Sequence, residues 1–192
     1  MSLLLETIKI EDGNIENLFY HQKRFDKSRN ELFELRDKLE LSSIIEAPQK
    51  GLYRCRILYD QEIHSIEYIP YKPKNIEKLK IITSNINYDY KYADREMFNT
   101  LLQTHSEYDE IIIEKDGYLT DTTISNIAFY DGLRWITPTK PLLEGTMRAK
   151  LLDEGFLQTK TIRKEDLKNY SQIALMNSMI GFKILNDFTI KI

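Results

Sequence analysis

Three Asp-Gly dipeptides, each placed after a short run rich in apolar residues, constrain the fold of this chain more than any other feature. Asp-Gly is typical of the tight turns that join neighbouring antiparallel strands. The dipeptides therefore predict strands rather than long helices in much of the chain. The expected strands are Leu3 to Ile10 before Asp12-Gly13, residues 109–114 before Asp116-Gly117, and a hairpin of residues 126–130 and 134–137 around Asp131-Gly132.

The remaining segments add one more hairpin and a few helices. Residues 51–59 and 62–71 alternate as strands do, with Asp60-Gln61 at the turn. Apolar residues recur at helical spacing between Ile15 and Leu41, which predicts a long amphipathic helix or a pair of helices. Further helices are expected from Asp94 to about His105 and from about Gly145 onward. This pattern predicts an α+β fold. Prolines 70 and 73 indicate a linker, so we expect a strand-rich region 1–74 and a larger region 75–192.

Composition excludes several classes of protein. The 192 residues are 42% hydrophobic and 30% charged, which is enough for a buried core, and no apolar run is long enough to span a membrane. The net charge is -3 with both signs interspersed, so we expect no nucleic-acid partner. A single cysteine, Cys55, excludes a disulfide framework, and the three scattered histidines predict no metal site. We expect a soluble cytoplasmic protein.

Four short motifs carry the candidate chemistry. They are Tyr90 to Arg95 with Lys91, Thr120 to Asn126 with Asp121, Gly145 to Arg148, and Met176 to Ser178. Taken singly, each motif has an ordinary explanation as a surface lysine, a turn residue, a helix start or a strand end. Taken together, they supply what pyridoxal phosphate needs: an amine for a Schiff base, a carboxylate that keeps its pyridine nitrogen protonated, and backbone amides at a helix start for its phosphate.

Together with Leu4 to Ile8 and His21 to Phe25, these motifs resemble the class IV aminotransferases, the type IV fold of pyridoxal-phosphate enzymes. The resemblance runs through most of the chain. It implies a small strand-rich N-terminal α/β domain, residues 1–74, and a larger C-terminal cofactor-binding domain, residues 75–192, with a barrel-like sheet and flanking helices. It also implies a homodimer, in which a partner loop completes an active site built between the domains.

The resemblance further implies a role for each motif. Lys91 would carry pyridoxal phosphate covalently and move a proton at the substrate. Asp121 would pair with the pyridine nitrogen, and Asn126 would support it. The phosphate would be bound by Arg24, by Gly145 and Thr146 at a helix start, and by Asn177 and Ser178.

Two departures from the usual family pattern, and one match to a particular form of it, bear on the reaction. Asp121 stands where the family usually has a glutamate, the first half is shorter than usual, and Lys91 is followed four residues later by Arg95, as in the lyase-like form of the motif. Branched-chain enzymes tend to carry a tyrosine where this chain has Glu96. The resemblance therefore implies a lyase that converts 4-amino-4-deoxychorismate, a small amino substrate, to 4-aminobenzoate and pyruvate in folate biosynthesis. An aminotransferase for branched-chain or D-amino acids and a non-catalytic cofactor-binding protein remain alternatives.

Overall fold

The computed structural model describes residues 2–192, which form two compact units. Unit 1 contains the residues up to Pro73 together with Tyr90–Asp94, and unit 2 contains Lys74–Asp89 and Arg95–Ile192. The expected division after residue 74 leaves Lys91 in the second region, whereas the structure places it in unit 1. The difference arises because residues 90–94 form backbone hydrogen bonds with the first strand of unit 1, which is far away in the sequence.

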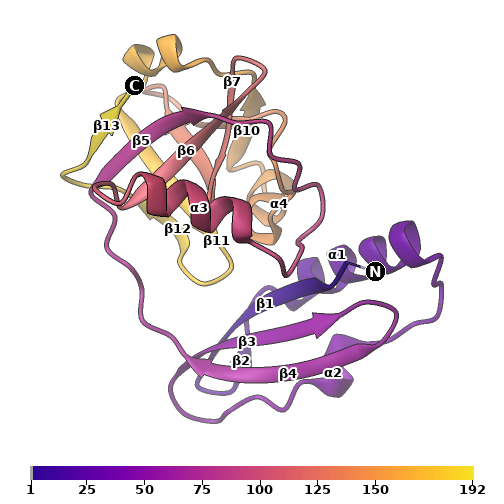
Figure 1. The fold of residues 1–192 in the computed structure, drawn as a ribbon. Helices are drawn as coiled ribbons and strands as arrows, with labels where there is room; N and C mark the ends of the chain where they lie inside the picture. The colour runs from indigo at the N-terminus through magenta and orange to yellow at the C-terminus, as the bar shows by residue number, and fades with distance from the viewer. Residues whose placement is uncertain (1) are drawn as a thin grey trace. The chain divides into compact units, whose positions relative to one another are not determined.

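Unit 1 is built on a four-stranded antiparallel sheet in the order β2-β1-β3-β4 (Figure 1). The two-residue turn Asp12-Gly13 joins β1 to β2, and both residues have positive φ, 48° and 83°, as a tight hairpin turn requires. The hairpin expected around Asp60-Gln61 is also present. The strands are β1 (Leu4–Glu11), β2 (Asn14–Ile15), β3 (Leu52–Tyr59) and β4 (Ile63–Pro70).

One helix, α1 (Leu18–Phe33), packs on this sheet through the fully buried Phe25. Of the two arrangements expected between residues 15 and 41, a single long helix is absent and two helices are present, the second of them short. The first, α1, ends because Glu34 adopts a left-handed conformation, with φ 59°, and Arg29 on its last turns binds Asp37 in the following loop. A single further turn, α2 (Leu41–Ile44), follows.

The segment Tyr90–Asp94 pairs with the first strand of unit 1. The amide of Leu5 donates to the carbonyl of Lys91 at 2.9 Å, and the amide of Ala93 donates to the carbonyl of Leu3 at 2.9 Å. The Tyr90 hydroxyl also donates to a carboxylate oxygen of Glu31 on α1 at 2.9 Å. These contacts fix the backbone of Lys91 against β1.

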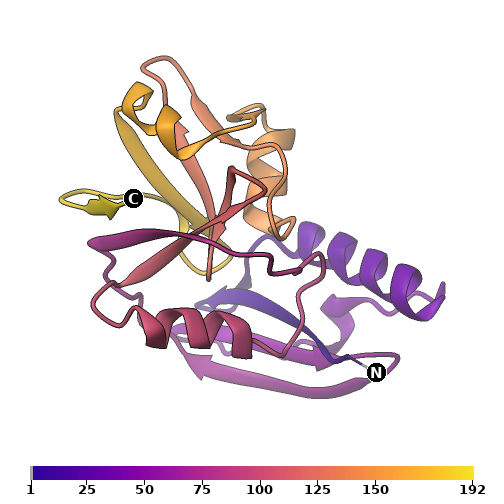
Figure 2. The same ribbon diagram turned by 45° about the horizontal axis from the view of Figure 1, so that its top comes forward.

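Unit 2 contains, within the described residues, a nine-stranded sheet in the order β10-β9-β8-β7-β6-β5-β13, with β11 paired to both β8 and β12. Figure 2 shows the strands of this unit in colours that run from magenta to yellow along the chain. The pairs β5 with β6, β5 with β13 and β9 with β10 are parallel, and the others are antiparallel. The strands are β5 (Lys78–Thr83), β6 (Glu110–Lys115), β7 (Tyr118–Thr122), β8 (Asn126–Tyr130), β9 (Trp135–Pro138), β10 (Leu157–Lys160), β11 (Gln172–Asn177), β12 (Gly181–Ile184) and β13 (Thr189–Lys191).

Buried side chains from several of these strands form a hydrophobic core cluster of unit 2. Among them are Leu79, Ile112, Phe129 and Leu175. The helices of unit 2 are α3 (Glu96–Thr104), which lies against β6, α4 (Thr146–Asp153) and the short 3-10 helix η1 (Lys164–Asn169). The expected α+β class is thus confirmed. No helix within residues 2–192 has the length and apolar character needed to cross a membrane.

Candidate active site

A buried ionic cluster in unit 1 orients Arg24. Glu6 projects from β1 toward α1 and is completely buried. Its carboxylate accepts two hydrogen bonds from the Arg24 guanidinium, from Nε at 2.8 Å and from Nη2 at 2.6 Å. His21, one helical turn before Arg24, places its Nδ1 2.6 Å from the same carboxylate. Arg24 is therefore held in a fixed fork geometry with its side chain only 13% exposed.

Burial and the neighbouring charges shift the pKa of both Glu6 and His21. Burial alone raises the pKa of Glu6, but the charge of Arg24 and the hydrogen bonds from His21 and Arg24 outweigh it and lower the pKa to about 2. Burial also lowers the pKa of His21, against the effect of Glu6. A carboxylate oxygen only accepts hydrogen bonds, so Nδ1 donates to it. Lys91 lies close enough for its charge to contribute to the lowered pKa of His21. Unit 1 thus brings Lys91 and Arg24 to the same cluster.

Replacing Glu6 with glutamine is expected to lower the free energy of unfolding by about 3 kcal/mol, because it leaves buried partners without their anion. In the wild type, the lowered pKa of Glu6 contributes stability that is fully present above about pH 4.5 and is lost as the pH falls toward about 2. Urea unfolding at about pH 5 and about pH 3 should therefore show a smaller acid-induced loss in the variant.

A matched control is Glu67→Gln, which removes an exposed carboxylate from the Arg56–Glu67 pair on the same sheet. This control should change stability by less than about 1 kcal/mol. Equal effects of the two substitutions would show that the Glu6 cluster contributes no more than a surface ion pair.

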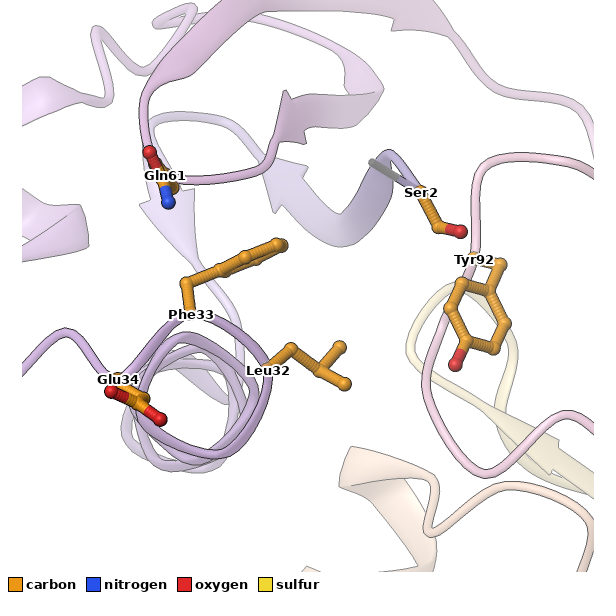
Figure 3. Close-up of a pocket in the computed structure, with 6 residues that line it drawn as sticks. All are labelled: Ser2, Leu32, Phe33, Glu34, Gln61 and Tyr92. Atoms are coloured by element: carbon orange, nitrogen blue, oxygen red, sulfur yellow. The ribbon is translucent and has the colours of Figure 1, made fainter.

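A hollow on unit 1 does not coincide with this cluster. Figure 3 shows Phe33 and Leu32 at the end of α1 and Tyr92 on the neighbouring segment, all lining the hollow. Among the described residues, neither Lys91 nor Arg24 lines this hollow. Its lining consists of Ser2, Leu32, Phe33, Glu34, Gln61 and Tyr92.

In unit 2, Asp121 is a buried carboxylate held by neutral donors. It lies on β7 opposite Asn126 on β8 and is 4% exposed. Oδ1 accepts from the Asn126 amide at 2.8 Å, and Oδ2 accepts from the backbone amide of Leu143 at 2.9 Å. Burial raises the pKa of Asp121 to about 6, although these bonds and the nearby charge of Arg148 oppose the rise. A carboxylate in this position is suited to pair with a cationic group.

Asn126 links Asp121 to the start of α4. Its side-chain amide also donates to the Leu143 carbonyl at 2.8 Å, and its Oδ1 lies against Gly145, the residue that precedes α4. A Cβ at position 145 would lie 2.0 Å from that oxygen. Position 145 therefore requires glycine because the Asn126 side chain fills the space, and Thr146 begins the helix immediately afterwards.

Replacing Gly145 with alanine is expected to destabilise the protein by about 1–3 kcal/mol, because the new methyl group displaces the Asn126 side chain. Thermal unfolding measures the effect. In the Asn126→Ala background the clash is absent, so the same glycine substitution should cost markedly less. An identical cost in both backgrounds would contradict the assignment of the clash to Asn126.

The other predicted phosphate residues lie at the end of β11. Asn177 donates through Nδ2 to the Ser125 hydroxyl at 2.9 Å, and its Oδ1 accepts from the amides of Met179 and Ile180 at 2.9 and 3.0 Å. Asn177 therefore shapes the turn that contains Ser178. It also binds this turn to the β7–β8 turn, which consists of residues 123–125. Unit 2 thus brings together six of the eight predicted residues: Asp121, Asn126, Gly145, Thr146, Asn177 and Ser178.

Sequence reasoning missed the role of Glu6. The signal for this role was a charged residue at an inward position of an alternating strand, opposite a helix with His21 and Arg24 on one face. Arg148, the last residue of the predicted motif Gly145 to Arg148, is buried near Asp121 and donates to the Pro138 carbonyl at 2.9 Å. These contacts are those expected of an arginine that pairs with an acid or orients a loop.

Comparison with known proteins identifies the class. The sequence matches the amino-transferase class IV family over residues 3–184. A relative from Haemophilus influenzae with no function given is 41% identical over 184 residues, which are 93% of this chain and 98% of the relative. A crystal structure of a proposed 4-amino-4-deoxychorismate lyase from Haemophilus somnus 129PT is 39% identical and has a TM-score of 0.85, covering 94% of this chain and 98% of that one.

A more distant structure adds information about the fold alone. The pyridoxal-phosphate-bound form of a hypothetical aminotransferase from Mycobacterium tuberculosis has a TM-score of 0.79 at 16% identity, covering 98% of this chain and 81% of that one. The chain belongs to the class IV aminotransferase family. It is an enzyme of the pyridoxal-phosphate-dependent lyase or aminotransferase type.

Proposed function

We propose that this enzyme is a 4-amino-4-deoxychorismate lyase that uses pyridoxal phosphate to release pyruvate and leave 4-aminobenzoate. The observation that carries the cofactor part of the proposal is the buried carboxylate of Asp121, which accepts hydrogen bonds from the neutral Asn126 side chain and the Leu143 backbone amide. Burial raises the pKa of Asp121 even with the charge of Arg148 nearby, so a cation bonded to this carboxylate would further favour its charged form. A protonated pyridine nitrogen is such a cation.

The side chains present fit the needs of the cofactor. Lys91 supplies the amine, Asp121 the carboxylate for the ring nitrogen, and Arg24 a guanidinium whose orientation is fixed by Glu6. Thr146 and the amides at the start of α4 supply donors that favour a phosphate dianion, and Ser178 adds a hydroxyl. When bound, pyridoxal phosphate supplies an electron sink for the carbon that carries the substrate nitrogen.

The residues of the chain then have separate tasks. Lys91 holds the cofactor and afterwards removes the proton from the substrate carbon that bears nitrogen. Asp121 keeps a proton on the ring nitrogen, and Asn126 and the Leu143 amide keep Asp121 in place. Arg24, Thr146 and Ser178 bind the phosphate. An aminotransferase needs a keto acid as its second substrate. A lyase needs none, because the group that it eliminates from the substrate leaves as pyruvate.

The choice of lyase rests on two observations. The chain is similar over almost its whole length to the Haemophilus somnus protein, and it has the Lys91 to Arg95 spacing of the lyase-like motif. Arg95 donates to the Thr123 carbonyl, and its guanidinium lies over the Phe98 ring at 4.7 Å from the centroid. We assign Arg95 to holding the β7–β8 turn.

The reaction type is tested with purified protein, pyridoxal phosphate and 4-amino-4-deoxychorismate, with and without a keto acid. A lyase releases pyruvate and 4-aminobenzoate in equal amounts without any keto acid. Amino-group transfer that requires a keto acid, with no release of pyruvate, would instead identify an aminotransferase. The homodimer implied by the family is part of the same proposal. Light scattering with cofactor present should give twice the chain mass of 22.8 kDa.

A further inference from the structure

A second buried carboxyl in unit 2 lies outside the set of predicted residues. Glu110 begins β6 and is 1% exposed. Its Oε1 accepts hydrogen bonds from the Thr123 hydroxyl at 2.5 Å, from the Thr123 amide at 3.1 Å and from the Ile111 amide at 2.9 Å. Its Oε2 is buried and, within the described residues, has no hydrogen-bond partner. Two of the three bonds thus go to one residue of the β7–β8 turn.

That turn is joined on its other side to the β11–β12 turn. Across the β7–β8 turn, the Thr122 amide and hydroxyl both donate to the Ser125 carbonyl, at 2.8 and 3.2 Å. The Ser125 hydroxyl then accepts from Asn177 at 2.9 Å. Asp121 lies just before this turn and Ser178 immediately after Asn177. Hydrogen bonds and covalently adjacent residues therefore connect Glu110 to Asp121 and Ser178, the residues assigned to the two ends of the cofactor.

The chemistry of Glu110 differs from that of a structural ion pair. Burial raises the pKa of Glu110 despite its hydrogen bonds and the charge of Lys74, which favours the uncharged carboxyl. A buried polar group with an unsatisfied atom costs stability, and an apolar residue of similar size would avoid that cost. Buried polar groups with an unsatisfied atom are therefore expected mainly at functional sites, and Glu110 is such a group.

We propose that Glu110 is a positioning residue for the cofactor site. It acts by holding the β7–β8 turn through Thr123, and so fixes Asp121 and Ser178 relative to each other. This inference rests on the proposed function, since it concerns the same cofactor. It assigns Glu110 no contact with cofactor or substrate.

The test compares three variants of the full chain by two measurements. Glu110→Ala removes the acceptor, whereas Glu110→Gln keeps a neutral group with the acceptor oxygen in place. Glu114→Ala is the matched control, because it removes another buried carboxyl from the same strand, where Glu114 binds Thr83 and Lys164 instead. Hydrogen exchange of residues 118–127 is followed without cofactor, and pyridoxal-phosphate affinity is measured by titration of its absorbance.

Glu110→Ala is expected to speed exchange in the β7–β8 turn and to weaken cofactor affinity, each by about tenfold or more. Glu110→Gln should stay within about threefold of wild type in both measurements, and Glu114→Ala should leave the turn and the affinity unchanged. Wild-type affinity in Glu110→Ala, or equal losses in the alanine and glutamine variants, would overturn the proposal. Failure of the wild type to bind pyridoxal phosphate would instead overturn the proposed function.

Discussion

Replacing Lys91 with alanine is expected to lower turnover by about four orders of magnitude or more, the largest effect of any single substitution in this chain. The side chain supplies both the covalent attachment for the cofactor and the group that removes the substrate proton. Lys91→Arg should be nearly as inactive, because a guanidinium keeps the positive charge but forms no Schiff base at neutral pH. Pyruvate release under saturating substrate and cofactor measures the loss.

The matched control is Lys9→Ala, which removes a lysine that pairs with Glu11 on β1 of the same unit. This control should retain turnover within about a factor of two, since a surface ion pair contributes little. Substantial activity in Lys91→Ala, with the fold intact by circular dichroism, would mean that another amine performs the chemistry.

Replacing Asp121 with asparagine is expected to preserve cofactor binding and to lower turnover by about two orders of magnitude or more. A neutral amide no longer favours the proton on the ring nitrogen that the electron sink requires. The amide also meets two donors, Asn126 and the Leu143 backbone, and can accept from only one of them through its oxygen. Cofactor titration and steady-state kinetics separate binding from turnover.

Asp121→Glu is the informative contrast, because it keeps the charge and introduces the residue that the family usually has at this position. It should retain clearly more activity than Asp121→Asn despite the extra methylene in a buried site. Near-wild-type turnover in Asp121→Asn would show that Asp121 only shapes the turn.

Much of the fold follows from local signals in the sequence. Asp12-Gly13 and Asp116-Gly117 form two-residue turns in which all four residues have positive φ, so the strands on either side could be predicted. Gly145 marks the start of α4 as expected. These features depend on residues close together in the chain, where turn chemistry and side-chain alternation act directly.

Other features of the fold depend on contacts that local patterns do not specify. Apolar spacing continues past Phe33, but the bond from Arg29 to Asp37 and the left-handed Glu34 end α1 there. The pairing of Lys91 with β1 depends on residues more than eighty positions apart, which no local pattern reveals. The expected division places residues 90–94 in the second region, whereas their backbone contacts place them in unit 1.

The candidate site was predictable in part for the same reason. Motif spacing identified Asp121 and Asn126, and the structure shows them as a hydrogen-bonded cross-strand pair. Sequence gave no indication that Asn177 uses its side chain to hold two turns together, or that Glu110 supports one of them. Burial and hydrogen-bond partners decide these roles, and both arise only after the strands are assembled.

The most direct test of the account is to reduce the protein with borohydride in the presence of pyridoxal phosphate and to locate the modified residue by peptide mass spectrometry. Reduction fixes the cofactor to the amine that carries it. The account predicts one modified peptide, which contains Lys91, and no such product in Lys91→Ala. Stoichiometric modification of any other lysine, with Lys91 unmodified, would contradict the central claim.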